Sequence, residues 1–523
     1  MKPYISVMRP MAIAGRQASA TSALVTVSVL LGALLLSLLF GLLLGTGNIL
    51  VSGFLLGLVG VVLAVGAPRA LFWASLVGSL VLSGLLELYV PGLQALRWAF
   101  AGSTALFLAA VLLQQFGVRS GTPPQPQPML TWAMLTFIAV FALSLVANWR
   151  GGVNAVFAAK NYFQAWGLFL GLAMMPAWLG LHRTLPKAML AIALLQLPFV
   201  LHQFFYLAPM RSAAGGLTAV DVVAGTFGAS LAGGGNNAAL AMFLVIVAAV
   251  LVSMWRTGAL GGRWLWLTPL LLLPIFLNES KVSVVYLVLA FVIIFKREII
   301  RRPLRFIGLS IAVAIIGAGL ILSYAALHQG SRATTPGELV EHVIRQNTEE
   351  GERYGSLLLN RTSSITHWWE ERERYSALNA LIGHGPSESK LATGLLDEAN
   401  NLGSRRYPGM GIGQTSISSV LWDFGVLGLV SLATIYLAAF ILAGRLARRH
   451  QDSAYLEGLF LGLQAGVAIL ALSLLHKASF TFQLGYQVFT LLVLGFLVAA
   501  WRWPPVDVAR TKQVTHHRRT TPR

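Results

Sequence analysis

The fold is decided by residues 415–442, which read TSISSVLWDFGVLGLVSLATIYLAAFIL and contain one charged side chain, Asp423. A helix needs about 20 apolar residues to cross the hydrocarbon core of a bilayer, and this stretch is long enough. It begins where the longest polar segment of the chain, residues 328–414, ends. A second apolar stretch, residues 306–327, ends where that segment begins. We therefore predict a membrane protein in which two spanning helices frame a large polar loop.

The composition extends this prediction to the whole chain. Of its 523 residues, 56% are hydrophobic and 11% are charged, whereas about a quarter of the residues in a soluble domain are charged. The chain has no cysteine, which excludes disulfides and thiolate metal sites. No Asp-x-Asp pair or histidine cluster indicates a metal, so we expect neither a metal nor another cofactor. We attribute the formal net charge of +19 to membrane topology and expect no nucleic-acid partner.

Fourteen apolar stretches are predicted to span the membrane, which gives an all-α polytopic fold of about 14 transmembrane helices. They are residues 21–44, 48–67, 70–89, 94–115, 129–147, 163–181, 186–206, 236–255, 264–278, 281–296, 306–327, 415–442, 456–475 and 485–501. An even number of spans places both termini on one side of the membrane.

The placement of Lys and Arg predicts which side that is. With a cytoplasmic N-terminus, the inside segments hold 23 of the 38 basic residues, and nine of the others lie in the 328–414 loop. Short loops rich in Lys and Arg stay in the cytoplasm, so we expect both termini there and the long loop outside. The predicted domains are residues 1–327 with spans 1–11, residues 328–414 as a mostly helical loop domain, residues 415–501 with spans 12–14, and residues 502–523 as a basic cytoplasmic tail.

The long loop carries helical signals of its own. Thr335-Pro336-Gly337-Glu338 is a capping box with proline at the first helical position, which predicts a short helix. A second helix is predicted from near Thr362, because Ile365, Trp368, Arg372, Tyr375 and Asn379 fall on one face at steps of three and four residues. We expect Trp368 and the neighbouring Trp369 to pack this helix onto the mouth of the bundle.

Three short polar stretches lie at the outer ends of predicted spans, and each allows two interpretations. The glycine-rich residues 225–237 could present free N–H groups to a phosphate at the start of a helix, or could form a flexible turn with close helix packing. Asn278-Glu279-Ser280-Lys281 is a functional charged pair or an ion pair at the interface. Asn148-Trp149-Arg150 is most simply an aromatic-belt residue beside a cation that reaches toward water, and Arg97 within a span could pair with Glu87.

Taken together, these stretches place several cations on the outer face of one bundle. They are Arg150, Arg211, Lys281, Arg361 and Lys477. Cations that converge beside free helix ends suit a pyrophosphate.

The order of these motifs resembles the O-antigen ligase and polymerase family. Arg211, Gly225-Thr226-Phe227-Gly228 and the stretch from Asn236 to Ala241 resemble its "G-T-F-G-N-x-N-x-L-A" motif, and Ser280-Lys281 stands where that family often has Ser-Arg. Asn360-Arg361, Trp368-Trp369 and residues 381–386 are similar to its "R…W…P-L-x-G-x-G" loop signature. Residues 421–429 are similar to its "L-x-E-x-G-I-x-G-L". The pairs Arg372–Gly383 and Arg374–Gly385 also fit the loose "R-x10-G" pattern of polymerases.

The resemblance implies a GT-C-like bundle with one large periplasmic loop in the bacterial inner membrane. It implies a metal-independent glycosyltransferase that moves a glycan from an undecaprenyl-pyrophosphate carrier to an acceptor hydroxyl. On this interpretation Arg211, Lys281 and Arg361 clamp the pyrophosphate, and the candidate bases are Asp221, Glu279 and His384. Further substrate-binding candidates are Arg150, Arg372 and Trp368. The expected partners are the carrier-linked glycan and membrane lipids, with a polysaccharide chain-length regulator as a candidate protein partner.

Two features favour a polymerase of O-antigen, exopolysaccharide or capsule repeat units over a ligase. Ligases commonly have a histidine a few residues before the span that follows the loop, where this chain has Gln414-Thr415-Ser416, and they resemble twelve-span proteins. The alternatives are an O-antigen ligase that transfers glycan to lipid A core, a lipid-linked glycan transporter or flippase, and a sensor or assembly scaffold. A transporter would need charges along the bundle interior and a repeat between halves, and the sequence indicates few such charges and no repeat.

The predicted topology is testable with reporter fusions. A fusion after Arg449 should give a cytoplasmic signal and one after Gly351 an exported signal, because basic short loops are retained inside. The reversed pair of signals would overturn the topology and every site that depends on it.

Overall fold

In the computed structural model, the segment Ala67–Arg523 forms one compact unit. The structure describes residues 66–90, 96–117, 125–175, 180–213, 219–231, 235–278, 280–301, 357–390 and 401–504, with a few single residues elsewhere. Several predicted elements lie outside these residues or have only a few residues within them. They are the spans 21–44 and 48–67, most of the span 306–327, the helix expected after Thr335 and the tail beyond Pro504.

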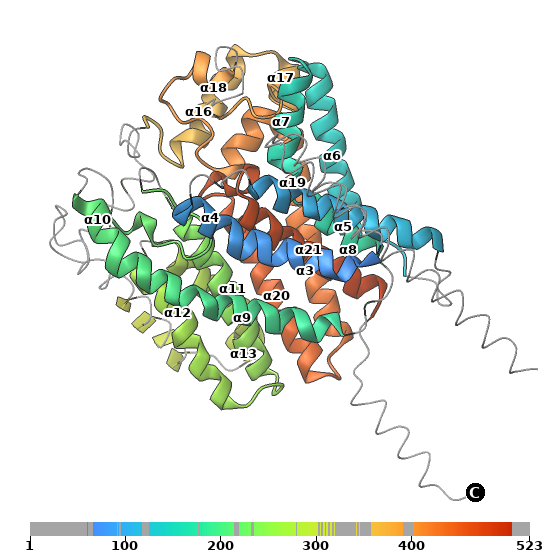
Figure 1. The fold of residues 1–523 in the computed structure, drawn as a ribbon, viewed down its shortest axis with the longest axis vertical. Helices are drawn as coiled ribbons and strands as arrows, with labels where there is room; N and C mark the ends of the chain where they lie inside the picture. Colours follow the sequence, from blue (N-terminus) through green and yellow to red (C-terminus); the bar gives the residue numbers. More distant parts are fainter. Residues whose placement is uncertain are drawn as a thin grey trace, which may run out of the picture. The chain divides into compact units, whose positions relative to one another are not determined.

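The described residues are almost entirely helical and contain no strand, only one isolated bridge between Ala229 and Gly235. This confirms the all-α prediction for that part of the chain. The helices in Figure 1 are α3 (Pro68–Val77), α4 (Ser83–Tyr89), α5 (Arg97–Gly117), α6 (Met129–Ala147), α7 (Gly152–Phe163), α8 (Trp166–Met174), α9 (Leu181–His202), α10 (Ala208–Ala213), α11 (Asn237–Arg256), α12 (Leu267–Leu277), α13 (Ser283–Arg301), α16 (Ser363–Glu371), α17 (Ala377–Ile382), α18 (Leu402–Arg405), α19 (Ser416–Arg449), α20 (Ala454–Ser473) and α21 (Leu484–Arg502).

Eight helical stretches among the described residues are long and apolar enough to cross a membrane. They are Pro68–Tyr89, Arg97–Gln115, Met129–Ala147, Leu181–Arg211, Asn237–Arg256, Ser416–Arg449, Ala454–Ser473 and Leu484–Arg502. They indicate a multi-pass membrane protein. The predicted span 163–181 instead contains the short, largely buried helix α8. Hydropathy did not reveal this, because an apolar run packed against other helices has the same hydropathy as one that faces lipid.

The centre of the bundle is built from α11, α20 and α21, whose apolar faces are the most buried of the eight. Helix α20 packs along α11 through Gly458, Gly462 and Gly466, which recur every fourth residue. A Cβ on Gly462 would lie 2.5 Å from the Cα of Val250 in α11. Small residues at this spacing let two helix backbones approach closely, which replaces the hydrophobic effect as the attraction between helices in lipid.

The loop helices α16, α17 and α18 lie together where α19 begins, at the top of Figure 1. We call this the loop end of the bundle. Trp368, Leu402, Tyr407, Ile412, Leu421 and Trp422 form a buried cluster that joins the loop to α19. The exposed fraction of Trp368 is 5% and that of Trp369 is 58%, so only the first of the two tryptophans packs as predicted.

The helix expected from Thr362 to Asn379 is two helices in the structure. Helix α16 ends at Glu371, and the hydroxyl of Ser376 accepts a hydrogen bond from the Asn379 N–H to start α17. Serine favours helix starts for this reason, and this local bond overrides the regular spacing of apolar residues. The residues 362–379 therefore wrap around Tyr407, whose hydroxyl donates to Glu371 at 2.9 Å.

Helix α19 is interrupted at Gly425, which has φ +62° and ψ −157°. This region of backbone conformation is open to glycine alone. The break frees the carbonyls of Trp422 and Asp423, which accept hydrogen bonds from the backbone N–H groups of His384 and Gly385 at 2.9 and 3.2 Å. The interruption therefore gives the loop a backbone docking site within a spanning helix.

Candidate functional site

A polar cavity of about 720 Å³ lies at the loop end, between the loop and the adjoining ends of the bundle helices. Its charged lining residues, among those that the structure describes, are the cations Arg97, Lys160, Arg361, Lys390 and Lys477 and the carboxylates Glu87 and Asp221. Arg361 and Lys390 come from the loop, and the others come from the bundle and its short connections. The cavity therefore carries three positive charges in excess when all of these groups are ionised.

Arg361 and Lys477 are fixed by backbone carbonyls. The Arg361 Nε donates to the His476 carbonyl at 2.7 Å, and the Lys477 Nζ donates to the Gly235 carbonyl at 2.7 Å. Burial lowers the pKa of Lys477, and the nearby Arg361 lowers it further against the opposing effect of Asp221. Burial, Arg361 and Lys477 together hold the pKa of His476 well below its usual value, so that its imidazole stays neutral.

Lys390 and Lys160 approach the cavity from another side. The Lys390 Nζ donates to the Thr481 carbonyl at 2.5 Å and lies 5.6 Å from the centre of the Tyr162 ring. Burial lowers the pKa of Lys390 to about 7, with Asp423 opposing and Lys160 reinforcing the shift. Burial, then repulsion from Arg97, lowers the pKa of Lys160 to about 8. Both amines therefore change charge near neutral pH.

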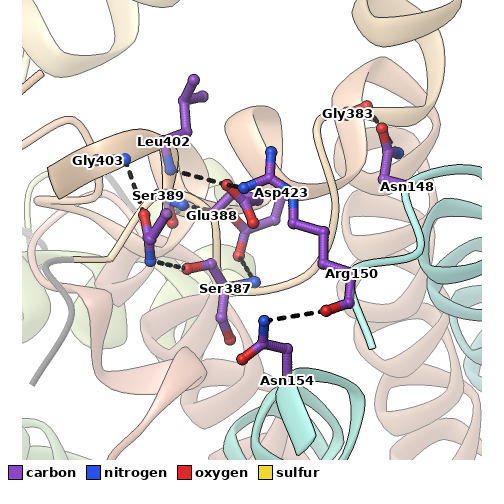
Figure 2. A network of polar contacts seen from close by, with 11 residues as sticks. Asn148, Arg150, Asn154, Gly383, Ser387, Glu388, Ser389, Leu402, Gly403 and Asp423 are labelled. Atoms are coloured by element: carbon purple, nitrogen blue, oxygen red, sulfur yellow. Dashed lines mark hydrogen bonds and ion pairs between the residues drawn. The ribbon is translucent and has the colours of Figure 1, made fainter. Parts of the chain in front are cut away.

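Asp423 holds the loop segment that carries Lys390. Its carboxylate accepts hydrogen bonds from the Tyr162 hydroxyl at 2.5 Å and from the backbone N–H groups of Ser387 and Ser389 at 2.7 Å each. Figure 2 shows Asp423 with Ser387 and Ser389. Charge-assisted bonds of this kind are roughly twice as strong as neutral ones, so this single buried carboxylate positions the residues on both sides of it.

A second carboxylate, Glu388, fixes the same segment from the other side. It pairs with Arg150 at 3.0 Å and accepts a hydrogen bond from the Leu402 N–H at 2.8 Å (Figure 2). Burial raises the pKa of Glu388 to about 7, although both of these partners favour its charged form. The sequence did not predict this ion pair. It ties the connection between α6 and α7, which carries Arg150, to the loop.

The structure brings together only some of the predicted site residues. Arg361 and Asp221 line the cavity. Arg211 is buried beside it, donates to the Ser230 carbonyl at 3.0 Å and lies 4.0 Å from Asp221. Lys281, in the turn that precedes α13, is not among the residues that line the cavity. Glu279 lies outside the described residues.

The remaining candidates are not among the residues that line the cavity, and three of the four lie within the loop. Arg372 stacks on the ring of Trp369 at 4.0 Å, and Trp368 belongs to the buried cluster. The His384 ring lies 4.3 Å from that of Tyr375, and burial followed by repulsion from nearby arginines lowers its pKa to about 4. Arg150 forms the ion pair with Glu388. These four residues stabilise the loop and its attachment to the bundle.

The first part of the glycine-rich stretch is a packing element. The side chain of Gln203 accepts hydrogen bonds from the Ala224 and Gly225 N–H groups, and that of Gln196 accepts one from the Thr226 N–H at 2.8 Å. A Cβ on Gly84 in α4 would lie 2.1 Å from the Thr226 carbonyl. The N–H groups of residues 224–226 are therefore bonded within the bundle, whereas Gly235, Asn236 and Asn237, where α11 begins, line the cavity.

Sequence reasoning missed Lys160 and Lys390 and assigned Arg97 only to Glu87. Lys390 has no motif around it, and its entry into the cavity depends on Asp423, 33 positions further along the chain. The one usable signal was Asp423 itself, the single charged residue of an apolar stretch, because such a residue is retained only where it is paired.

No protein-family model matches the chain, and no curated protein matches it as a relative. Within the described residues, no group of three or more His, Asp or Glu side chains could hold a metal ion.

The role of Asp423 is testable by Asp423→Asn. An amide has one acceptor oxygen, so at least one of the three donors loses its partner, at about 1.5–3 kcal/mol per charge-assisted bond. We expect faster proteolysis within the loop of the detergent-solubilised protein and a lower unfolding temperature. Glu370→Gln, on the exposed face of α16, is the control and should behave as wild type. Equal cleavage of both variants would show that Asp423 does not hold the loop.

Proposed function

We propose that the protein polymerises the repeat units of a surface polysaccharide by transferring glycan from an undecaprenyl-pyrophosphate carrier to an acceptor sugar hydroxyl. The reaction would take place at the periplasmic face of the inner membrane. The observation that carries the proposal is the cationic cavity at the loop end, which lies in the region whose motifs resemble the O-antigen ligase and polymerase family.

The charge and position of the cavity fit a membrane-bound pyrophosphate. The cavity carries three excess positive charges, or two when Lys390 is neutral, and such charges in a partly buried site are costly unless an anion compensates them; a pyrophosphate supplies the compensation. Arg361 offers a planar guanidinium that can bind two phosphate oxygens, while Lys477 and Arg97 add further positive charge. The walls of the cavity at the ends of apolar helices would let the isoprenoid tail remain in the bilayer while its headgroup enters.

The proposed reaction needs a base beside this clamp, and Lys390 meets the requirement best. The acceptor oxygen bonds to the anomeric carbon of the donor sugar as the bond from that carbon to the pyrophosphate breaks. The hydroxyl proton passes to the neutral amine of Lys390, and the negative charge departs on the pyrophosphate. The pKa of Lys390, about 7, lies near the working pH, whereas His476 is too weakly basic and His384 lies outside the cavity.

A deletion strain separates the candidate activities. Loss of polymer with single repeats retained indicates a polymerase, and retained polymer that fails to reach lipid A core indicates a ligase. Loss of all outer material indicates a flippase. The Gln414-Thr415-Ser416 sequence, which lacks a ligase-type histidine, supports the first outcome.

Substitutions in the cavity test the clamp. Arg361→Ala and Lys477→Ala should each lower the rate of polymer formation by roughly 10²–10³ because a charged donor to the leaving group is lost. Arg361→Lys should restore activity only in part, since a point charge cannot make two parallel bonds. The matched control is Arg374→Ala, an exposed residue paired with Glu371, which should keep near-normal chain lengths on a polysaccharide gel. Fully active Arg361→Lys would exclude the bidentate clamp.

The pH dependence tests the two titrating amines. The wild-type rate should rise through about pH 7 as Lys390 loses its proton and becomes a base, and fall above about pH 8 as Lys160 loses its charge. Lys390→Arg stays charged, so it should remove the rising limb and lower the plateau rate by roughly 10²–10⁴. Lys160→Arg should remove only the falling limb. An unchanged rising limb in Lys390→Arg, measured with purified protein, would assign the base elsewhere.

A further inference from the structure

A second charged cavity lies at the opposite end of the bundle, where α11 and α19 end and α20 begins. Its volume is about 140 Å³. Four cations from three helices line it: Arg256, Lys296, Arg297 and Arg448. The placement of Lys and Arg in the sequence predicts that this end faces the cytoplasm.

The cations around this cavity outnumber the carboxylates. The Arg256 guanidinium donates to Glu298 at 2.8 and 2.6 Å, and Arg297 lies 3.7 Å from Glu457. The Lys296 Nζ donates to the neutral side chain of Gln464 at 2.9 Å. Four cations and two carboxylates leave two positive charges in excess around the cavity.

Hydrogen bonds to neutral groups hold the side chains at the base of the cavity in place. The Gln464 side chain accepts the bond from Lys296 and donates to the Phe440 carbonyl at 3.3 Å. A Cβ on Gly444 would lie 2.5 Å from the Gln464 Nε2, so the glycine makes room for this amide. Lys296 is thus held at the cavity by a partner that leaves its charge uncompensated.

We propose that this cavity binds a phosphate group, most simply that of an anionic membrane lipid headgroup. A tetrahedral phosphate accepts hydrogen bonds from several directions, as donors on three different helices require. The cavity holds about four to five times the volume that one water molecule occupies, about 30 Å³, which suits a phosphodiester. Arg256 and Arg448 lie at the last turns of α11 and α19, the level at which headgroups meet spanning helices.

The competing explanation is that these cations only hold the orientation of the helices in the membrane. In that case every basic residue at this end would contribute equally to lipid binding, wherever its side chain points. The two explanations therefore differ in whether position around the cavity matters. The proposal does not depend on the catalytic role of the cavity at the loop end.

The experiment compares two double variants of the full-length protein in neutral detergent. Lys296→Gln with Arg448→Gln removes two cations from the cavity, and Arg301→Gln with Arg445→Gln removes two exposed cations from the same two helices outside it. Binding of dioctanoyl phosphatidylglycerol is measured by native mass spectrometry, with dioctanoyl phosphatidylcholine and inorganic phosphate as the other probes. The cavity variant should bind phosphatidylglycerol roughly 10- to 30-fold more weakly than wild type, and the control variant within about twofold of it.

Each outcome decides the proposal. Preference for phosphatidylglycerol, lost in the cavity variant alone, supports a lipid headgroup. Inorganic phosphate that binds as well and shows the same loss assigns the cavity to a free phosphate. Equal losses in both double variants, or no loss in either, overturn the site. Arg448→Gln alone, at an exposed position, provides the same comparison with Arg445→Gln if the double variant does not fold.

Discussion

The attachment of the loop to the bundle depends on one buried carboxylate. Asp423 is the single charged residue of the apolar stretch 415–442, where an unpaired charge would be expensive, and three hydrogen bonds compensate for its burial. Two of the three donors are backbone N–H groups of the loop, so the requirement to satisfy the carboxylate also fixes the loop. The interruption at Gly425 adds two backbone bonds beside it. This attachment holds the loop segment that brings Lys390 to the cavity.

The same attachment concentrates positive charge. Lys390 and Lys160 lose basicity because burial, and then repulsion from neighbouring cations, favours their neutral forms. Arg361, which stays charged at any physiological pH, cannot respond in this way. The cavity therefore combines a permanent cation with amines that titrate near neutrality, the two components that the proposed reaction requires.

Charge is distributed differently at the two ends of the bundle. At the loop end, half-buried cations such as Lys390 and Lys477 surround a large cavity bounded by the loop, whereas at the opposite end cations such as Arg448 are exposed and surround a small one. Between them α11 and α20 pack through Gly462 and its neighbours with little polar surface. The apolar centre separates the two cavities, so substitutions at one end are expected to leave the other intact.

The sequence by itself determined the membrane class, the helical fold and the bounds of helices such as Met129–Ala147, because these follow from local hydropathy and length. It also identified Arg361 and Asp221, which lie beside recognisable motifs. Tertiary structure alone decided which helices face lipid and which cations share a cavity. Helix α8, for example, is apolar but packs against other helices. Lys390 meets Arg361 only after a carboxylate far along the chain has bound the loop, and no local pattern encodes a contact between segments so distant in sequence.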